Sequence, residues 1–300
     1  TNLISAARNF LLEEVPINRF TSLIGNIMAA RISSLLDFSG PAMTISSEEN
    51  SVFRALEIAQ MLLAENTVEA VVITAVDLAG SPEQVLLRNR NFPLNSGKST
   101  LSFDRDVNGW MIGEGAGTLV LKSLENAKTD REQIYATLDS VAFSNGISAK
   151  SVEDAARQAL KKAKLKTQEI GILEVFGSGN EIEDKAEMSG LSKLYSGQNS
   201  TCAIGGIKAN LGHTFAASGM ASLIKAALCL HHRFIPGVPE WMSPKTELLS
   251  GNEFYVPVES RPWLIQPDIP KRHAAISGLG QDNVCSHVIL SEAQAELRPK

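Results

Sequence analysis

The stretch GPAMTISSEENSVFRALEIAQMLL, residues 40–63, spells out a strand, a tight turn and a helix. Met43, Thr44 and Ile45 are residue types that favour extended backbone. From Val52 onward, apolar side chains recur at intervals of three and four, which predicts a helix with one buried face. Residues 46–50 therefore stand at a helix N-terminus, where unpaired N–H groups and the helix dipole favour a nucleophile or an anion site.

This stretch resembles the segment of β-ketoacyl synthases that runs from a Gly-Pro pair to the nucleophilic cysteine. These enzymes condense acyl units in fatty-acid and polyketide synthesis and have a thiolase-like fold. Glu49 stands at the cysteine position. A carboxylate cannot replace the thiolate, because acyl transfer to it gives a reactive anhydride instead of an exchangeable thioester. Taken alone, a glutamate at a helix start also suits an ordinary role in capping or dipole compensation.

A second and longer match lies at residues 103–127, FDRDVNGWMIGEGAGTLVLKSLENA. It is very similar to the β-ketoacyl synthase pattern FDxxxxGxxxGEGAGxxVLKxLxxA, and residues 118–121 are expected to continue as a strand. The apolar run in residues 69–80 predicts another strand, buried on both faces, and hence a parallel α/β layer. The resemblance implies an α/β, thiolase-like fold with two pseudo-duplicated halves and layered α-β-α-β-α sheets.

The resemblance runs from Phe20 to Ala293. It implies that residues 1–130 are the remainder of an N-terminal half whose opening part is absent, and that residues 131–300 form the C-terminal half. Together they would make one ketosynthase-like domain of a longer polypeptide. Within the second half, residues 133–146 and 169–179 read as strands, and residues 151–165 read as an amphipathic helix opened by Ser151.

The first catalytic histidine of the family belongs to an EAHGTGT-like motif at a strand end. The matching run here, residues 174–180, reads EVFGSGN and places Phe176 at the histidine position. Phenylalanine can neither donate a hydrogen bond to a developing oxyanion nor exchange a proton. Asp184 and Glu187 match later acidic positions of the motif.

The third catalytic region is retained in residues 204–230, which resemble GSVKSNxGHTxxAAGxxGLIK. Lys208, Asn210 and His213 stand at family positions; His213 would polarise the carbonyl of an extender thioester, and Lys208 would orient its neighbours. A structural alternative is that Lys208 pairs with a carboxylate such as Glu49 or Glu187, while His213 caps the following helix.

Near the C-terminus, residues 274–293 resemble the family's gating loop, GVSSFGFGGTNAHVVLEEA. Leu279 and Gln281 stand at the phenylalanine positions, Asp282 and Asn283 replace glycines, and Cys285 replaces an asparagine. The resemblance therefore places Leu279, Gln281 and Asn210 at the acyl pocket. Cys285 lies in an apolar strand, which indicates a small buried residue rather than a displaced nucleophile.

Composition narrows the kinds of partner, metal site and location that we expect for the chain. The net charge of −5 argues against nucleic acid as a partner. Three cysteines without CxxC spacing argue against a disulfide framework and a zinc site, and they favour a reducing cytoplasm. No apolar run reaches the roughly 18 residues that a bilayer span needs, so membrane insertion is not expected. No metal site is predicted, since the acidic residues near Asp104 lack the spacing of a calcium loop.

With two of three catalytic positions changed, the sequence predicts a non-condensing, chain-length-factor-type subunit or domain of fatty-acid or polyketide synthesis. It would pair with an active ketosynthase in a pseudo-symmetric dimer and shape acyl chain length. Its second expected partner is acyl carrier protein, which carries the phosphopantetheine arm, so no cofactor of its own is expected. Two alternatives are a decarboxylase of malonyl-carrier-protein that supplies starter units and a purely architectural domain; an active ketosynthase would require a different alignment.

Overall fold

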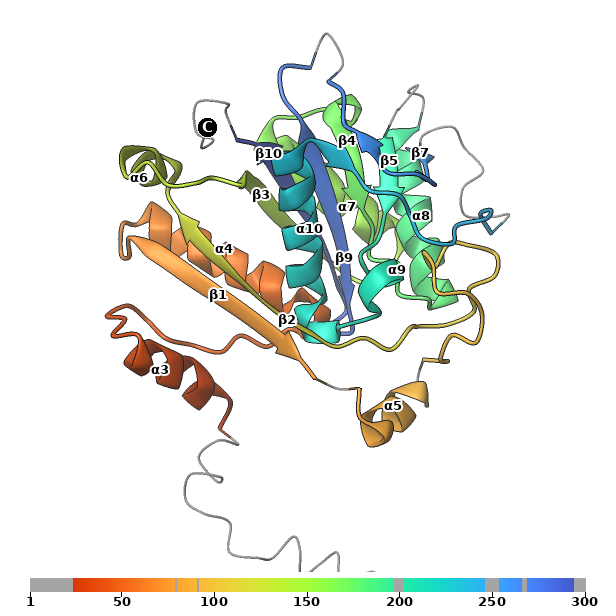
Figure 1. Cartoon of the computed structure of the whole chain (residues 1–300), viewed down its shortest axis with the longest axis horizontal. Helices are drawn as coiled ribbons and strands as arrows, with labels where there is room; N and C mark the ends of the chain where they lie inside the picture. The colour runs from red at the N-terminus through yellow and green to blue at the C-terminus, as the bar shows by residue number, and fades with distance from the viewer. Residues whose placement is uncertain are drawn as a thin grey trace, which may run out of the picture. The chain divides into compact units, whose positions relative to one another are not determined.

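The computed structural model describes residues 24–78, 80–90, 92–196, 202–245, 254–265 and 269–293 (Figure 1). The chain divides into two compact units, residues 1–45 and residues 46–300. No helix among the described residues is both long and apolar enough to cross a bilayer. The division at residue 130 suggested by the family resemblance remains a prediction.

The first unit contains one described helix, α3, Gly25–Leu35, and none of its residues is buried. The expected strand at residues 43–45 is wrong, because these residues form no ladder. Instead, Thr44 donates its backbone N–H to Asn26 Oδ1 at 2.8 Å and its hydroxyl to Gly25 O at 2.9 Å. Thr44 therefore hydrogen-bonds to residues of α3 and not to a neighbouring strand.

The second unit is built on a six-stranded mixed sheet with the order β3-β10-β9-β4-β5-β7. Strand β10 runs antiparallel to both β3 and β9, whereas β9, β4, β5 and β7 are parallel to one another. The strand bounds are β3 Ala136–Asn145, β4 Ile170–Glu174, β5 Cys202–Gly205, β7 Phe254–Tyr255, β9 His273–Gly280 and β10 Val284–Glu292. These bounds confirm strands within residues 133–146 and 169–179.

Helices cover both faces of this sheet (Figure 1). Alternate residues of β9 serve the two sides: Ala275 packs with α7, Ala149–Ala163, and α8, Glu181–Tyr195, while Ile276 packs with α4, Ser51–Ala64, and α10, Ser218–His232. This division follows from the period-2 alternation of side chains along a strand. The sheet is therefore sandwiched between two helical layers.

A two-stranded ribbon lies beyond α4 and α10. It consists of β1, Ala70–Asp77, paired antiparallel with β2, Gly115–Lys122. Its inward residues, such as Ile73, join the same core as α4 and α10. The four successive layers of this unit are therefore helix, sheet, helix and sheet, and the α/β prediction is confirmed.

Two local expectations were wrong. Strand β1 is not buried on both faces, since exposure alternates along it and Val72 is 40% exposed, and its neighbour is antiparallel. Helix α7 begins at Ala149 with Ser148 as its N-cap, whose hydroxyl accepts a hydrogen bond from Ser151 N. Ser151 instead donates its own hydroxyl to Asn145 O at 2.8 Å. The sequence therefore located the strand and the helix, but not the burial pattern of β1 or the residue that caps α7.

The remaining elements are short connections. The bounds are η1 Glu48–Asn50, α5 Pro82–Asn89, α6 Leu124–Thr129, η2 Thr167–Glu169, α9 Lys208–Leu211, η3 Phe215–Ala217, β6 Phe234–Ile235 and β8 Arg261–Pro262. Strands β6 and β8 pair antiparallel as a separate ribbon. The elements η1, α9 and η3 each supply one residue of the site described next, and α5 and loop segments supply the others.

Candidate functional site

Glu49 lies in η1, immediately before α4, as the helix pattern predicted. Its side chain is buried, and Oε2 accepts a hydrogen bond from Gln281 N at 2.9 Å. Burial raises the pKa of this carboxyl above its ordinary value, and the hydrogen bond from Gln281 opposes that shift. Glu49 is therefore held in place by the β9–β10 turn and does not stand exposed at the helix start.

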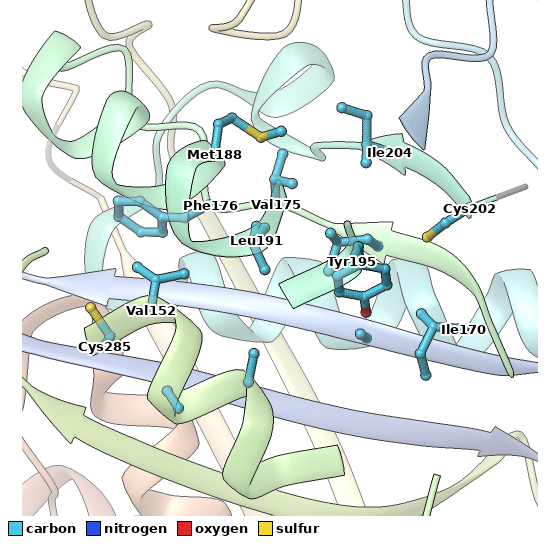
Figure 2. Close-up of a cluster of buried hydrophobic side chains, with 14 of the residues drawn as sticks. Val152, Ile170, Val175, Phe176, Met188, Leu191, Tyr195, Cys202, Ile204 and Cys285 are labelled. Carbon is cyan, nitrogen blue, oxygen red and sulfur yellow. The ribbon is translucent and has the colours of Figure 1, made fainter. Parts of the chain in front are cut away.

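Phe176 lies two residues beyond the end of β4. Its backbone N–H donates to Glu187 Oε1 at 2.7 Å, and Gly177 N donates to Glu187 Oε2 at 2.9 Å. The ring belongs to the buried cluster formed between the sheet and helices α7 and α8 (Figure 2). Glu187 thus fixes the backbone of this motif and, through it, the position of the Phe176 ring.

The ring of Phe176 contacts two retained polar residues. Lys208 Nζ lies 4.0 Å from the ring centroid, within cation–π range. The His213 ring makes an edge-to-face contact with Phe176, with centroids 5.5 Å apart and an interplanar angle of 86°. Both retained side chains therefore pack against this phenyl ring.

His213 also packs against a second aromatic ring. Phe215 stacks on it with centroids 4.1 Å apart, and Arg88 Cζ lies 3.4 Å from the centroid of the Phe215 ring. His213 Nδ1 accepts a hydrogen bond from Phe215 N at 3.0 Å, so the histidine does cap the start of η3. Desolvation, followed by the charges of Lys208 and Arg88, lowers the pKa of His213 well below its ordinary value. The imidazole is therefore neutral at pH 7.

We call the stacked residues Arg88, Phe215, His213, Phe176 and Lys208 the aromatic column. Sequence motifs mark only three of these five residues, Phe176, His213 and Lys208. Phe215 and Arg88 were missed, although Phe215 follows His213 by two residues and an aromatic side chain at that spacing was visible. Arg88 could not have been found, because α5 is distant in the sequence and only the folded chain brings it to this place.

Lys208 begins α9 and is buried. Desolvation lowers its pKa to about 8, and the nearby carboxylates of Glu187 and Glu174 oppose that shift, followed by Glu49. The two carboxylates considered as ion-pair partners both accept backbone hydrogen bonds, Glu49 from Gln281 and Glu187 from Phe176 and Gly177. The lysine is thus stabilised by a field of several carboxylates together with the face of Phe176.

The cavity at the site has a volume of about 10 Å³, which is room for about one water molecule. Its lining residues are Glu49, Phe92, Trp110, Ser178, Glu183, His213, Phe215 and Gln281. Burial raises the pKa of Glu183 as it does that of Glu49. An acyl chain or an extender unit does not fit into this volume.

The three residues expected at an acyl pocket lie apart. Gln281 lines the small cavity, Leu279 is buried in the core between the sheet and α7, and Asn210 is exposed on α9. Cys285 is 1% exposed, and burial raises the pKa of its thiol to about 12. It is therefore protonated at pH 7, and a protonated, buried thiol is a poor nucleophile.

A larger apolar groove of about 390 Å³ runs between β2 and α10, past residues such as Gly117, Ile224 and Leu228. Neither Glu49, Phe176 nor Lys208 lines it, so it is separate from the aromatic column. Among the described residues, no group of three or more histidine, cysteine, aspartate or glutamate side chains is arranged to hold a metal ion.

The retained histidine and lysine, the substituted nucleophile and the motif order all point to one family. Residues 6–127 match the family described as "Beta-ketoacyl synthase, N-terminal domain", and residues 133–241 match "Beta-ketoacyl synthase, C-terminal domain". The chain belongs to the β-ketoacyl synthase family. Its ketosynthase signatures thus span both halves of the family's domain, and the resemblance seen in the sequence is confirmed.

Similar proteins are parts of large synthases. The chain is 35% identical over 291 residues to a polyunsaturated fatty acid synthase subunit of Thraustochytrium sp., covering 92% of this chain and 14% of that protein. It is 31% identical to the polyketide synthase PksL of Bacillus subtilis, covering 91% of this chain and 6% of that protein. This ketosynthase-family chain therefore spans a small share of these relatives.

Solved structures confirm the thiolase-like fold. The ketosynthase from module 6 of the bacillaene synthase of Bacillus subtilis 168 superposes with a TM-score of 0.83 at 30% identity, over 90% of this chain and 51% of that one. A structure titled "PfaC Keto synthase-Chain length factor" is 40% identical with a TM-score of 0.72, over 93% of this chain and 26% of that one. The chain spans about half the length of the bacillaene ketosynthase and a quarter of the PfaC structure.

Proposed function

We propose that this chain is a non-condensing, chain-length-factor-type component of a polyunsaturated fatty-acid or polyketide synthase. It pairs with an active ketosynthase and shapes the length of the acyl chain that its partner builds. The observation that carries the proposal is the filled site: the Phe176 ring packs against both Lys208 and His213, and the cavity beside Glu49 holds about one water molecule.

Chemistry supports the same conclusion. A condensing enzyme needs a nucleophile that carries the acyl chain as a thioester and hydrogen-bond donors that stabilise the developing enolate. Here the nucleophile position holds a buried carboxylate, and one of the donor positions holds a phenyl ring. His213 and Lys208 remain, but the column packs them against aromatic rings, which leaves no room for a thioester carbonyl.

The name of the PfaC structure supports the chain-length-factor role, because it joins a ketosynthase with a chain length factor in one protein. In this proposal, acyl carrier protein delivers substrates on its phosphopantetheine arm to the partner ketosynthase. This chain needs no cofactor of its own for that role.

The retained Lys208 and His213 also motivate decarboxylation of malonyl-carrier-protein as a second function. A decarboxylase must stabilise a carbanion, and the buried Glu49 places a carboxyl group beside the site. When ionised, that group opposes the forming negative charge, and the cavity leaves no space for a malonyl group. The geometry therefore favours the non-condensing partner.

Intact-protein mass spectrometry tests the proposal. The full-length protein is incubated with acyl- and malonyl-carrier-protein, alone and together with a candidate partner ketosynthase. The expected result is an acyl mass gain on the partner alone and no release of carbon dioxide by this chain. Acylation of this chain at any residue contradicts the proposal, and carbon dioxide release from malonyl thioester by this chain alone establishes the decarboxylase instead.

Product analysis in the assembled synthase distinguishes the proposed chain-length role from a purely architectural role. Substitutions in this chain that leave assembly intact but shift the length of the product support the chain-length role. Substitutions that alter assembly and never alter product length support an architectural domain.

A further inference from the structure

The turn between β9 and β10, residues 281–283, lies directly against η1. Asn283 N donates to Gly280 O at 3.0 Å and closes the turn, in which Asn283 has a left-handed φ of 60°. A Cβ atom added at Gly280 would lie 2.5 Å from both Asn50 Nδ2 and Asp282 Oδ1. The turn and η1 are therefore in close contact, although they are far apart in the sequence.

Asp282 is the centre of this contact. Its Oδ2 accepts a hydrogen bond from Ser47 Oγ at 2.5 Å, and its Oδ1 accepts from Asn50 Nδ2 at 3.0 Å and from Val284 N at 3.2 Å. One carboxylate thus ties its own turn to the segment that carries Glu49. Hydrogen bonds to an ionised acceptor are stronger than those between neutral groups.

Neighbouring groups complete the network. Asn50 Nδ2 also donates to Val284 O at 2.9 Å, and Asn50 Oδ1 accepts from Ser286 Oγ at 2.7 Å. Gln281 N donates to Glu49 Oε2 at 2.9 Å. Asn50 is completely buried, so its amide is satisfied only by protein groups of this network.

The positions that form this network differ from those of the family's gating loop. Asp282 and Asn283 replace glycines there, and glycine is the residue that allows a loop to change its backbone conformation. An aspartate with three hydrogen bonds has the opposite effect, because moving the turn would leave its carboxylate and the buried Asn50 without partners.

We infer that Asp282 is a latch that holds the β9–β10 turn against η1 and so keeps the site beside Glu49 closed. The latch is a conformational device of this chain itself. It gives the chain a fixed wall at the position where the family resemblance implies a moving gate. The inference does not depend on the proposed partner role, since its readout involves neither acyl transfer nor a partner.

Hydrogen–deuterium exchange on the full-length protein tests the latch. Asp282→Gly removes all three hydrogen bonds of the carboxylate. We expect exchange at least about tenfold faster in residues 279–285 and also in residues 47–51, because the two segments support each other. Helix α7 serves as an internal reference for global unfolding.

Asn283→Gly is the matched control. It places the same residue in the same turn, at a left-handed φ that suits glycine, and it keeps the backbone bonds of Asn283 to Gly280 and Gly146. We expect little change in residues 47–51. Equal exchange in the Asp282→Gly and Asn283→Gly proteins would overturn the latch, and so would faster exchange limited to the turn.

Ser47→Ala probes the network from its other end and keeps the test decisive if Asp282→Gly fails to fold. Loss of this hydroxyl is expected to speed exchange in residues 279–285, although Ser47 and Asp282 are 235 positions apart. Unchanged exchange in that turn would refute the inference.

Discussion

At the scale of single residues, Phe176 is an apolar side chain in contact with polar neighbours. Its backbone N–H donates to Glu187, and its ring contacts both Lys208 Nζ and the His213 ring. Phenylalanine offers no proton and no hydrogen bond, yet it packs well in a buried position. The ring is therefore part of the core at this place.

Phe176→Ala tests this packing role. The ring is 5% exposed, so its removal should lower the free energy of unfolding by about 3 kcal/mol or more, through lost burial and the cavity left behind. Chemical denaturation measures the change. Phe234→Ala, at a ring that is 39% exposed, is the control and should cost about 1 kcal/mol or less. Similar losses in the two variants would show that Phe176 does not act as a core residue.

His287 is a second residue whose environment conflicts with its chemistry. It is 1% exposed, and neither ring nitrogen has a hydrogen-bond partner among the described residues. Desolvation lowers its pKa to about 3. The folded protein therefore keeps this imidazole neutral, whereas the unfolded chain binds a proton near pH 6.5. The contribution of the neutral His287 to the free energy of unfolding is therefore complete above pH 6.5 and is lost as the pH falls toward 3.

His287→Leu should remove this contribution. Between pH 7.5 and pH 5, acidification should reduce the free energy of unfolding by about 2 kcal/mol less in His287→Leu than in the wild type. Urea unfolding at the two pH values gives the comparison. His213 and His273 shift in the same direction, so the variant retains part of the loss. If the exposed His232→Leu reduced the acid effect as much, burial of His287 would not be its cause.

At the scale of elements, α4 is held against the central sheet by a close fit between Phe53 and a glycine of β9. A Cβ added at Gly278 would lie 2.6 Å from the Phe53 ring and 2.4 Å from Ser286 Oγ. Such distances are shorter than contact distances between carbon atoms. The glycine is therefore required by packing at a place where the chain runs as an ordinary strand.

Gly278→Ala should destabilise the protein by about 1–3 kcal/mol, because the ring or the strand must move. Thermal or urea unfolding measures the loss. Gly115→Ala on β2 is the matched control, since its added Cβ would meet only Thr214 Cγ2 at an ordinary 3.4 Å, and we expect a change within about 0.5 kcal/mol. Equal effects would mean that the Phe53 contact does not set the position of α4.

At the scale of the whole molecule, the proposed role places the chemistry in the partner. The site beside Glu49 is closed by two sets of contacts, the aromatic column and the Asp282 network. Substituting a residue of a site that does no chemistry should affect structure and assembly, but not the rate of the chemical step.

Glu49→Gln in the assembled synthase provides a test at this scale. Glutamine keeps an oxygen that can accept the hydrogen bond from Gln281 N and removes the ionisable group. We expect the rate of product formation to stay within about twofold of the wild type, because the proposed role places condensation on the partner. A loss of tenfold or more with intact assembly would mean that Glu49 takes part in the reaction.

Much of the site was readable in the sequence. The motifs around Glu49, Phe176 and His213 identified the family, because motif spacing survives substitution at single residues. Helical and strand patterns located α4, β3 and, within two residues, α7, since local patterning follows the period of each element. The sequence could not show that the β1 run alternates between buried and exposed, because a run that is apolar throughout has no visible period.

The sequence by itself determined the family and the order of the elements, which depend on residue identity and spacing. Only the tertiary structure decided that the site is closed. The cation of Arg88 reaches the column from α5, and the carboxylate of Asp282 reaches Ser47 and Asn50 across more than 200 residues of chain. Such contacts depend on which side chains the packing of helices and sheets brings together, and a local sequence pattern does not contain that information.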